Sequence, residues 1–340
     1  MYNEIIMQLS KKNKHYRSLN EPLIHRLREL AKLQANREKA NGSDKAADYT
    51  LLQSQKTMLR SDKIMACGTF IELHLQDNTA KVKSGNFCHD KFCALCSKIK
   101  SVKRYSQMLN VLNYLRETGQ IYDNEQTRII GMITLTQRNV TVENLADELD
   151  TLQTAIKRLT QSKTWQDSIK GYAKSLEITY NPKEKTYHPH FHFLVVWDKQ
   201  TYNLSTQTIQ QLWKRSLRIG YYPQCDIREA YGQNADLSKI ISECLKYNVK
   251  AAKESDKPLY SDLTVQEFET FINALKGRRF ISYSGVIAEV RNILKYPSED
   301  TDKSTNVQIP TDIQLPKEAH DILLHWSESE QQYKLYPEAP

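Results

Sequence analysis

The sequence has no long run of apolar residues. None of its hydrophobic stretches approaches the roughly 18 residues that a membrane-spanning helix needs, and the polar start from Met1 to Pro22 lacks the apolar segment of a secretory signal. Internal repeats and low-complexity tracts are also missing, which argues against repeat architectures. We therefore expect a cytoplasmic protein that has no membrane partner.

Apolar residues are scarce overall. The residues A, V, I, L, M, F, W, Y and C make up 39% of the 340 residues, which is low against the roughly 45–50% apolar content of average domains. The length is enough for one large domain or two ordinary ones whose cores need no disulfide bonds. We therefore expect much of the chain to lie on surfaces or in tails.

Negative charge is in the minority and is unevenly placed. The chain has 48 Lys and Arg residues against 40 Asp and Glu residues, a net charge of +8. Residues 296–340 hold nine acids and three bases, so residues 1–295 carry +14. Such an excess favours a polyanionic partner, most commonly nucleic acid, although a basic, well-solvated protein would have the same balance.

The composition divides the chain into four segments. Residues 1–60 predict a helical, basic N-terminal arm, residues 61–120 a Cys-rich knuckle followed by a helix, and residues 121–295 the main body. Residues 296–340 predict an acidic C-terminal tail with one helix around residues 322–326.

The main body has the patterns of alternating strands and helices. Period-two patterns predict strands, and apolar residues spaced by three and four predict amphipathic helices. In chain order the elements are a strand at 129–136, a helix at 145–159, strands at 172–180 and 190–197, a helix at 209–217 and a strand at 225–228. This β-α-β-β-α-β order is ferredoxin-like and predicts an α+β fold in which helices cover one face of an antiparallel sheet.

Three histidines fall within five residues, at His188, His190 and His192. Alternate residues of a strand lie on the same face of the sheet, so the three imidazoles would lie on one face. Two imidazoles at i and i+2 can hold one divalent cation if a carboxylate on a neighbouring strand completes the set. Glu177, which has apolar neighbours on the preceding strand, is the preferred carboxylate, and Glu184 in the turn and His188 itself are the competing ligands.

A helix expected over about residues 236–253 carries a second group of reactive side chains. Glu243 and Tyr247 lie one helical turn apart, with Lys246 and Lys250 beside them. Such a phenol could attack a phosphodiester, with the lysines steering the phosphate and the carboxylate acting as a base. The alternatives are a surface glutamate that pairs with a nearby lysine and a tyrosine that, like most of the 19 in the chain, serves in packing.

Four of the six cysteines are clustered, at Cys67, Cys88, Cys93 and Cys96. In a reducing compartment, clustered thiols indicate a metal site rather than disulfides. Four thiolates suit a closed tetrahedral Zn²⁺ site with a structural role. His89 could replace one of the four cysteines as a ligand.

Together these motifs resemble the replication initiator (Rep) proteins of small rolling-circle plasmids, which are single-tyrosine HUH endonucleases. The resemblance covers about residues 64–290. The matching segments, in the family's order, are the Cys knuckle, Ile133–Thr136 followed by Arg138–Val140, His188–His192 with Glu177 upstream, Glu243–Lys250, and Lys276–Arg279 leading into Ser284–Val286. The knuckle departs from the family's usual pattern at Lys91 and Ala94, and neither change removes a ligand.

The resemblance implies an HUH endonuclease domain over residues 121–295. Glu177, His190 and His192 would hold Mg²⁺ or Mn²⁺ at the scissile phosphate. Tyr247 would attack this phosphate, which leaves a 5′-phosphotyrosine and a free 3′-OH primer. Strand transfer, or a water activated by Glu243, would end the replication cycle.

The resemblance also implies the partners. Origin DNA would be bound as a duplex with a locally single-stranded or hairpin nick site, and a host helicase and the replication machinery would follow. Lys246, Lys250, Arg278 and Arg279 are candidates for contacts with DNA, together with the basic residues that follow the knuckle and the N-terminal arm. Phosphate contacts would make this binding weaken steeply with salt.

Three other functions are compatible with the same residues. An HUH relaxase or transposase would share the histidines and the tyrosine. A non-catalytic, zinc-dependent DNA-binding regulator would use the histidines as a second structural site. A metallohydrolase would attack with a metal-bound water at His190 and His192 and would form no covalent adduct with DNA.

Overall fold

The computed structural model contains two compact units, each assembled from separate parts of the chain. The first unit comprises Met1–Lys103, Leu263–Phe268 and Lys303–Pro340, and the second comprises Arg104–Asp262 and Glu269–Asp302. The structure describes residues 3–40, 44–77, 79–121, 128–199, 204–230, 235–245, 260, 262–298, 307–309 and 318–336. Among the helices in these ranges, none combines the length and the apolar character that crossing a bilayer would require.

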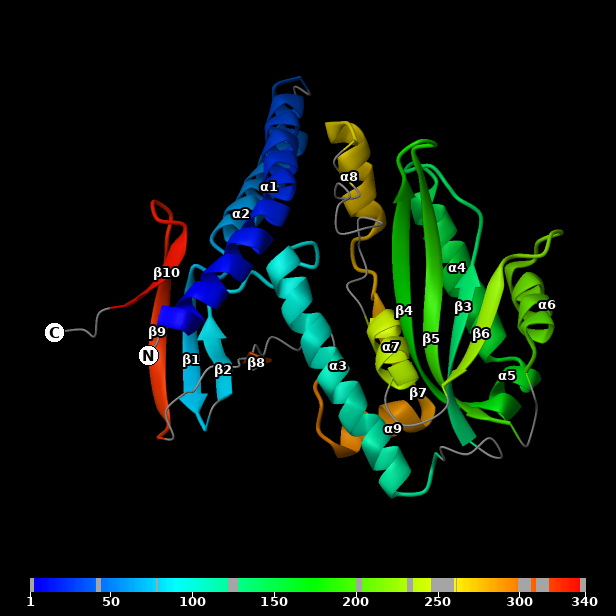
Figure 1. Cartoon of the computed structure of the whole chain (residues 1–340). Helices are drawn as coiled ribbons and strands as arrows, with labels where there is room; N and C mark the ends of the chain where they lie inside the picture. Colours follow the sequence, from blue (N-terminus) through cyan, green and yellow to red (C-terminus); the bar gives the residue numbers. More distant parts are fainter. Residues whose placement is uncertain are drawn as a thin grey trace. The chain divides into compact units, whose positions relative to one another are not determined.

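Two long helices and a five-stranded sheet form the first unit. Helices α1 (Asn3–Ala40) and α2 (Asp44–Met65) run side by side (Figure 1). The two helices lie where the sequence predicts helical structure, and the apolar residues Leu23, Leu27 and Leu30 of α1 are buried. All strand pairs of the sheet are antiparallel, in the order β10-β9-β1-β2-β8.

The strands of this sheet come from both ends of the chain. β1 (Phe70–Gln76) and β2 (Thr79–Gly85) form a hairpin, and β1 also pairs with β9 (His320–Ser327). The edge strands are β10 (Gln332–Leu335), which contacts α1, and β8 (Val307–Ile309). The first and last parts of the chain therefore share one unit.

The helix predicted around residues 322–326 is wrong, because these residues form β9. Ile322, Leu324 and Trp326 are buried, whereas Leu323 between them is 40% exposed. This alternation is the period of a strand. Over so short a stretch, the spacing of the apolar residues fits a helix as well as a strand. Pairing with β1, which is distant in the sequence, determines that these residues form a strand.

The second unit is built on a second antiparallel sheet, with strand order β6-β3-β5-β4-β7. Its chain order confirms the predicted strands and helices of the main body and adds β7 and the short helices α5 and α9. The elements are β3 (Arg128–Thr136), α4 (Leu145–Thr160), α5 (Lys163–Ser168), β4 (Ile169–Asn181), β5 (Thr186–Asp198), α6 (Thr206–Leu217), β6 (Cys225–Ala230), α7 (Ala235–Leu245), β7 (Ile281–Ser284) and α9 (Gly285–Ile293).

Two further helices, α3 (Ala94–Glu117) and α8 (Val265–Ala274), have residues in both units. A capping box precedes α8, because the Thr264 backbone NH donates to Glu267 Oε2 at 2.7 Å. The Glu267 backbone NH in turn donates to Thr264 Oγ1 at 3.2 Å.

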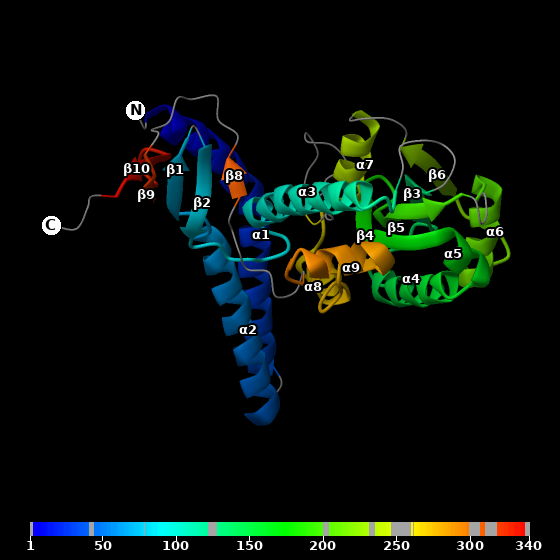
Figure 2. The same cartoon turned by 90° about the horizontal axis from the view of Figure 1, so that it is seen from below.

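The two faces of the second sheet are different. On one face, residues such as Phe193 contact Trp165 of α5, and Lys174 donates to Gln153 of α4. On the other face, one apolar core joins β3, β4 and β5 to α7, α9 and the part of α3 that begins at Arg104 (Figure 2). Along the strands, the side chains of this second face change from apolar to polar. The polar part of the face contains Glu177, His190 and His192.

Candidate active site

The structure brings Glu177, His190 and His192 together on neighbouring strands of the second unit. Glu177 of β4 is directly opposite His190 of β5, and His192 follows two residues later on the same face. Glu177 Oε2 lies 3.0 Å from His192 Nε2 and 3.4 Å from His190 Nε2. The three ligand atoms all lie within 4.8 Å of one another, a spacing that could hold a metal ion.

The carboxylate of this group is ionised. Burial by itself would raise the pKa of Glu177, but hydrogen bonds and charge from His190 and His192 outweigh it and hold the pKa far below its usual value. A carboxylate and two imidazoles together leave several positions open on a six-coordinate cation. The group can therefore hold a divalent ion and still admit a substrate oxygen.

Neighbouring acceptors orient both imidazoles. His192 Nδ1 lies 3.1 Å from Thr134 Oγ1, and His190 Nδ1 lies 3.2 Å from the His188 carbonyl oxygen. If each Nδ1 carries the proton, both Nε2 lone pairs point toward Glu177, as metal ligation requires. Thr134 stands opposite His192 on β3, so the strand register provides this contact.

His188 lies next to this group but outside it. Its Nδ1 is 2.9 Å from Asn139 Oδ1, and its ring centroid is 5.3 Å from that of His190. Burial, and then the charge of His190, lower the pKa of His188. Neither His188 nor Glu184 belongs to the metal-ligating groups found among the described residues.

Helix α7 places Glu243 near the edge strand β6. Its apolar residues Leu237, Ile240, Ile241, Cys244 and Leu245 are buried. Glu243 Oε2 lies 3.7 Å from Arg228 Nη1. The helix as described ends at Leu245. Tyr247, Lys246 and Lys250 lie outside the described residues.

The two arginines predicted to contact DNA have different surroundings. Arg278 is bound to α4, where Nη1 lies 2.6 Å from Asp150 Oδ1 and Nη2 donates to the Ala146 carbonyl oxygen at 3.0 Å. The hydrogen bond from Arg278 lowers the pKa of Asp150. Arg279 lines a surface pocket of about 240 Å³ that also includes Tyr296.

In the first unit the four predicted cysteines form one cluster. Cys67 Sγ lies 3.4 Å from Cys96 Sγ and 3.7 Å from Cys93 Sγ, and Cys88 Sγ lies 3.6 Å from Cys96 Sγ. Hydrogen bonds from the other three thiols, with that of Cys67 first, hold the pKa of Cys93 far below its usual value. These contacts favour the thiolate form of Cys93, the form that binds metals.

Helices α1 and α2 support the cysteine cluster. Asn20 Nδ2 donates to Cys93 Sγ at 3.3 Å, and Asn20 Oδ1 accepts from the Ala94 backbone NH at 2.8 Å. On α2, Arg60 Nε lies 2.6 Å from Asp90 Oδ2, within the knuckle. The knuckle is therefore fixed to both helices.

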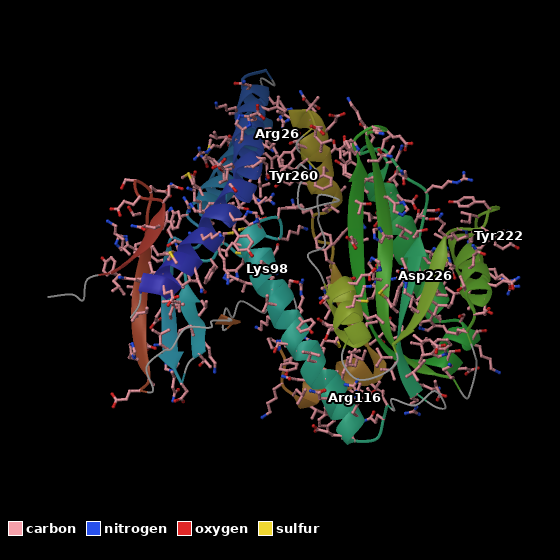
Figure 3. The ribbon with its side chains drawn as sticks, in the orientation of Figure 1. Arg26, Lys98, Arg116, Tyr222, Asp226 and Tyr260 are labelled. Atoms are coloured by element: carbon pink, nitrogen blue, oxygen red, sulfur yellow. The ribbon has the colours of Figure 1, made fainter. Side chains whose placement is uncertain are left out.

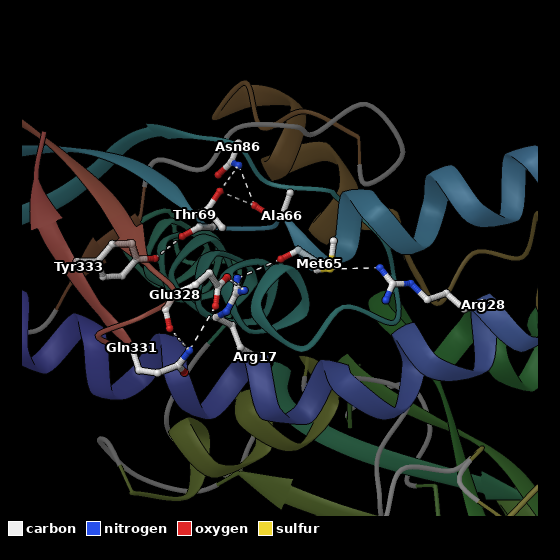
Figure 4. A network of polar contacts seen from close by, with 10 residues as sticks. Arg17, Arg28, Met65, Ala66, Thr69, Asn86, Glu328, Gln331 and Tyr333 are labelled. Carbon is white, nitrogen blue, oxygen red and sulfur yellow. Dashed lines mark hydrogen bonds and ion pairs between the residues drawn. The ribbon is translucent and has the colours of Figure 1, made fainter.

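A separate network holds the loop that carries Cys67 (Figure 4). Arg17 of α1 donates to the Met65 carbonyl oxygen at 3.1 Å and pairs with Glu328. Asn86 donates to the Ala66 carbonyl oxygen at 2.8 Å, and the hydroxyl of Tyr333 in β10 donates to the Gly68 carbonyl oxygen. Helix α1, the segment between β2 and the knuckle, and strand β10 therefore all contact this loop.

Sequence reasoning missed several residues at both sites. Thr134 and Asn20 bind the side chains of predicted ligands, and Asp226 of β6 stands level with Thr134 across the sheet (Figure 3). Thr134 lies in Ile133–Thr136, one of the segments that resemble the family's motifs, and this was the available signal. Nothing in the local pattern around Asn20 connects it to cysteines more than seventy residues later.

The chain is similar to known replication proteins. The family described as "Replication protein" matches residues 79–334. A "Protein rep" of Bacillus sp is 29% identical over 269 residues, which cover 72% of this chain and 83% of the relative. A "Protein rep" of Lentilactobacillus hilgardii is 27% identical over 82% of this chain and 88% of the relative.

A third relative, a "Protein rep" of Streptococcus pneumoniae, is 26% identical over 71% of this chain and 77% of the relative. No solved structure matches the chain. The family match covers both the cysteine cluster from Cys88 onward and the whole Glu177–His190–His192 group. The chain therefore belongs to the Rep family of replication proteins, as its motifs predicted.

Proposed function

We propose that this protein initiates rolling-circle plasmid replication by nicking one strand of its origin. The observation that carries the proposal is the Glu177–His190–His192 group, which stands on a sheet face within a chain of the replication protein family. Two imidazoles and one ionised carboxylate form a set suited to a divalent cation with open positions. A nickase that must bind a phosphate oxygen needs such positions.

The sheet of the second unit supports assignment to the HUH endonucleases. Its core has the chain order β3-α4-β4-β5-α6-β6 and the strand order β6-β3-β5-β4, with the short α5 before β4. This chain order and strand order support a ferredoxin-like fold. In it the histidine-bearing strand β5 lies at the centre, between β3 and β4.

The chemistry follows from the residues of this face. Glu177, His190 and His192 would hold Mg²⁺ or Mn²⁺, which when bound supplies positive charge to the scissile phosphate. The Tyr247 oxygen would attack phosphorus and lose its proton, and the O3′ of the preceding nucleotide would leave and take up a proton. The products are a 5′-phosphotyrosine and a 3′-OH end that a polymerase can extend.

Helix α7 supports the assignment of Tyr247 and Glu243. Its buried residues belong to the same apolar core as Met132 of β3 and Leu194 of β5. These two residues are paired across the strands, next to the pair formed by Thr134 and His192 on the same face. Tyr247 comes two residues after the end of this helix as described. Glu243, which lies 3.7 Å from the exposed Arg228, would activate the water that ends the cycle, unless strand transfer ends it.

The cysteine cluster would hold a structural Zn²⁺. Zinc–sulfur bonds of about 2.3 Å in a tetrahedron separate the sulfurs by about 3.8 Å. Three of the sulfur separations in the cluster, 3.4, 3.6 and 3.7 Å, are close to this spacing. The ion would join the knuckle to Cys67 and so brace the first unit.

Origin DNA is the proposed partner, followed by a host helicase and the replication machinery. Lys246, Lys250 and Arg279 are proposed to contact phosphates. Arg278 would first have to leave Asp150 and the Ala146 carbonyl oxygen of α4, so its contribution to DNA binding is proposed to be smaller. Alternatives with the same chemistry are a relaxase or a transposase, and an alternative without chemistry is a DNA-binding regulator.

The covalent adduct tests the proposal. Full-length protein is incubated with Mn²⁺ and a 3′-labelled single-stranded oligonucleotide that contains the plasmid's nick region, and SDS-resistant labelled protein is measured. Wild type should form the adduct, EDTA and Glu177→Gln should abolish it, and Tyr247→Phe should lose it. Tyr336→Phe, in the first unit, is the matched control and should behave as wild type.

Other outcomes are equally informative. Nicking of a 5′-labelled strand without an adduct would favour the metallohydrolase. An adduct that persists in Tyr247→Phe would assign the nucleophile to another tyrosine. Binding without cleavage on a verified origin would favour the regulator.

A further inference from the structure

A pocket of about 400 Å³ lies beside the Glu177–His190–His192 group, entirely within the second unit. Six of its lining residues come from the end of β3, the start of β5 and the segment before β6: Thr136, Arg138, His188, Tyr221, Tyr222 and Gln224. Its volume is in the range of small-molecule sites. None of these residues has a part in the cation binding or the nucleophilic attack proposed above.

The walls of the pocket carry two aromatic rings, each stacked with a cation. The guanidinium carbon of Arg138 lies 3.7 Å from the ring centroid of Tyr221, and Lys214 Nζ lies 3.8 Å from that of Tyr222. Tyr222 is nonetheless 60% exposed, near the surface of α6 (Figure 3). An exposed aromatic ring beside positive charge is the combination that stacks a nucleobase and attracts its phosphates.

The pocket is continuous with the cation-binding group. His188, which lines the pocket, and His190, which belongs to the group, have ring centroids 5.3 Å apart. Thr136, which also lines the pocket, is directly opposite His190 across β3 and β5. A strand whose phosphate lies at His190 therefore passes the mouth of this pocket.

Buried contacts fix the walls of the pocket in place. Gln137 is 8% exposed, and its Oε1 accepts from the Tyr221 hydroxyl and, at 3.0 Å, from the Arg138 backbone NH. The buried Trp213 Nε1 donates to the Thr136 carbonyl oxygen at 2.8 Å. A site held in this way loses little conformational freedom when it binds a ligand.

We propose that this pocket receives one unstacked base of the single strand, next to the nucleotide that is cleaved. Tyr222 stacks on the base, Arg138 and Lys214 lie beside the adjoining phosphates, and the strand is thereby positioned with its scissile phosphate at the cation. The inference rests on the proposed function, because it assigns the pocket to the strand that is nicked. Duplex DNA is not accepted, because its bases are stacked and cannot enter.

Binding without chemistry tests the pocket. In EDTA, full-length protein is titrated into single-stranded oligonucleotides of the nick region in which 2-aminopurine replaces one base at a time. One position should change its fluorescence on binding. Tyr222→Leu should weaken binding by roughly 5- to 150-fold, the range measured for single stacked bases, and should abolish the change at that position, whereas Tyr222→Trp should retain both.

An abasic site supplies the sharper control. Removal of the base at the responding position should weaken binding to wild type but leave binding to Tyr222→Leu unchanged, since the two changes remove the same contact. Lys214→Ala should instead reduce the salt dependence of binding. Tyr336→Leu, in the first unit, should match wild type.

The pocket assignment is overturned if a folded Tyr222→Leu variant binds like wild type, or if the abasic site weakens both proteins equally. Failure of the proposed function would look different. If a base binds at Tyr222 but no adduct forms in Mn²⁺, the pocket assignment stands and the nicking function is rejected. If an adduct forms but no oligonucleotide position depends on Tyr222, the nicking function stands and the pocket assignment is rejected.

Discussion

Thr134 Oγ1 and His192 Nδ1 lie 3.1 Å apart, across the register of β3 and β5. This contact fixes the ring so that Nε2 faces Glu177. Residues that orient a metal-binding histidine in this way typically contribute 10- to 100-fold to metal affinity.

Thr134→Val should therefore weaken Mn²⁺ binding by roughly 10- to 100-fold, while saturating Mn²⁺ should restore nicking. Isothermal titration with Mn²⁺, and nicking as a function of Mn²⁺ concentration, would measure this. Thr154→Val, on α4, is the control and should leave the affinity unchanged. Equal affinities for Thr134→Val and wild type would show that the threonine does not orient the ring.

Cys96→Ser should remove bound zinc and destabilise the first unit. The cluster ties Cys67, ahead of β1, to the start of α3, so its loss frees both ends. Metal content by mass spectrometry of the purified chain should fall from about one zinc to none, with a lower melting temperature. Cys225→Ser, outside the cluster, should keep its zinc, and zinc retained by Cys96→Ser would remove the cysteine from the ligand set.

Gly285→Ala should strongly destabilise the second unit. Gly285 has φ +56°, and an added Cβ would lie 2.1 Å from the Lys170 carbonyl oxygen, so α9 could not approach β4. We expect a loss of more than about 3 kcal/mol, since a backbone clash adds to the left-handed conformation.

Gly277→Ala is the matched control for Gly285→Ala. Gly277 has φ +70°, but an added Cβ there would meet nothing within 4 Å. Only the cost of the left-handed conformation remains, about 1 kcal/mol. Urea unfolding of both variants separates the two effects, and equal losses would contradict the close approach at Gly285.

Lys174 gives the second unit a pH dependence of stability. Burial lowers the pKa of this lysine from 10.5 to about 8, because the charged form is costly between the sheet and α4. Below pH 8 the side chain is protonated in both states, and the folded state carries the whole cost. Between pH 8 and 10.5 the unfolded chain binds more protons, so this cost disappears as the pH rises.

Lys174→Met should therefore raise stability by roughly 1–3 kcal/mol below pH 8, and the gain should vanish above pH 10.5. Urea unfolding at several pH values measures it. Lys157→Met, at an exposed position of α4, should show no such trend. A gain for Lys174→Met that is constant with pH would mean that burial does not lower the pKa of this lysine.

The candidate active site was readable from the sequence because its parts are local. His190 and His192 share a face by strand period alone, and a short turn folds β5 back on β4 so that Glu177 reaches them. Helices α4 and α6 of the second unit were equally readable, since each has a broad apolar stripe of its own. Local signals of this kind need no partner to be recognised.

The rest depended on contacts that no local pattern reports. β9 was taken for a helix because its partner β1 lies near the other end of the chain. Asn20 reaches Cys93 only after α1 has packed on the knuckle. The pocket at Tyr222 is made by two loops that the sheet brings together, and neither loop has a period to detect.

The pairing of β1 with β9 also determines when each unit can be completed during synthesis. All strands of the second sheet leave the ribosome before β9 does, since they end at Ser284 and β9 begins at His320. Until then, β1 keeps one side without its native partner, an exposed edge of the kind that invites aggregation. Translation therefore supplies the whole sheet of the second unit first and completes the first unit last, although the first unit begins at the N-terminal end of the chain.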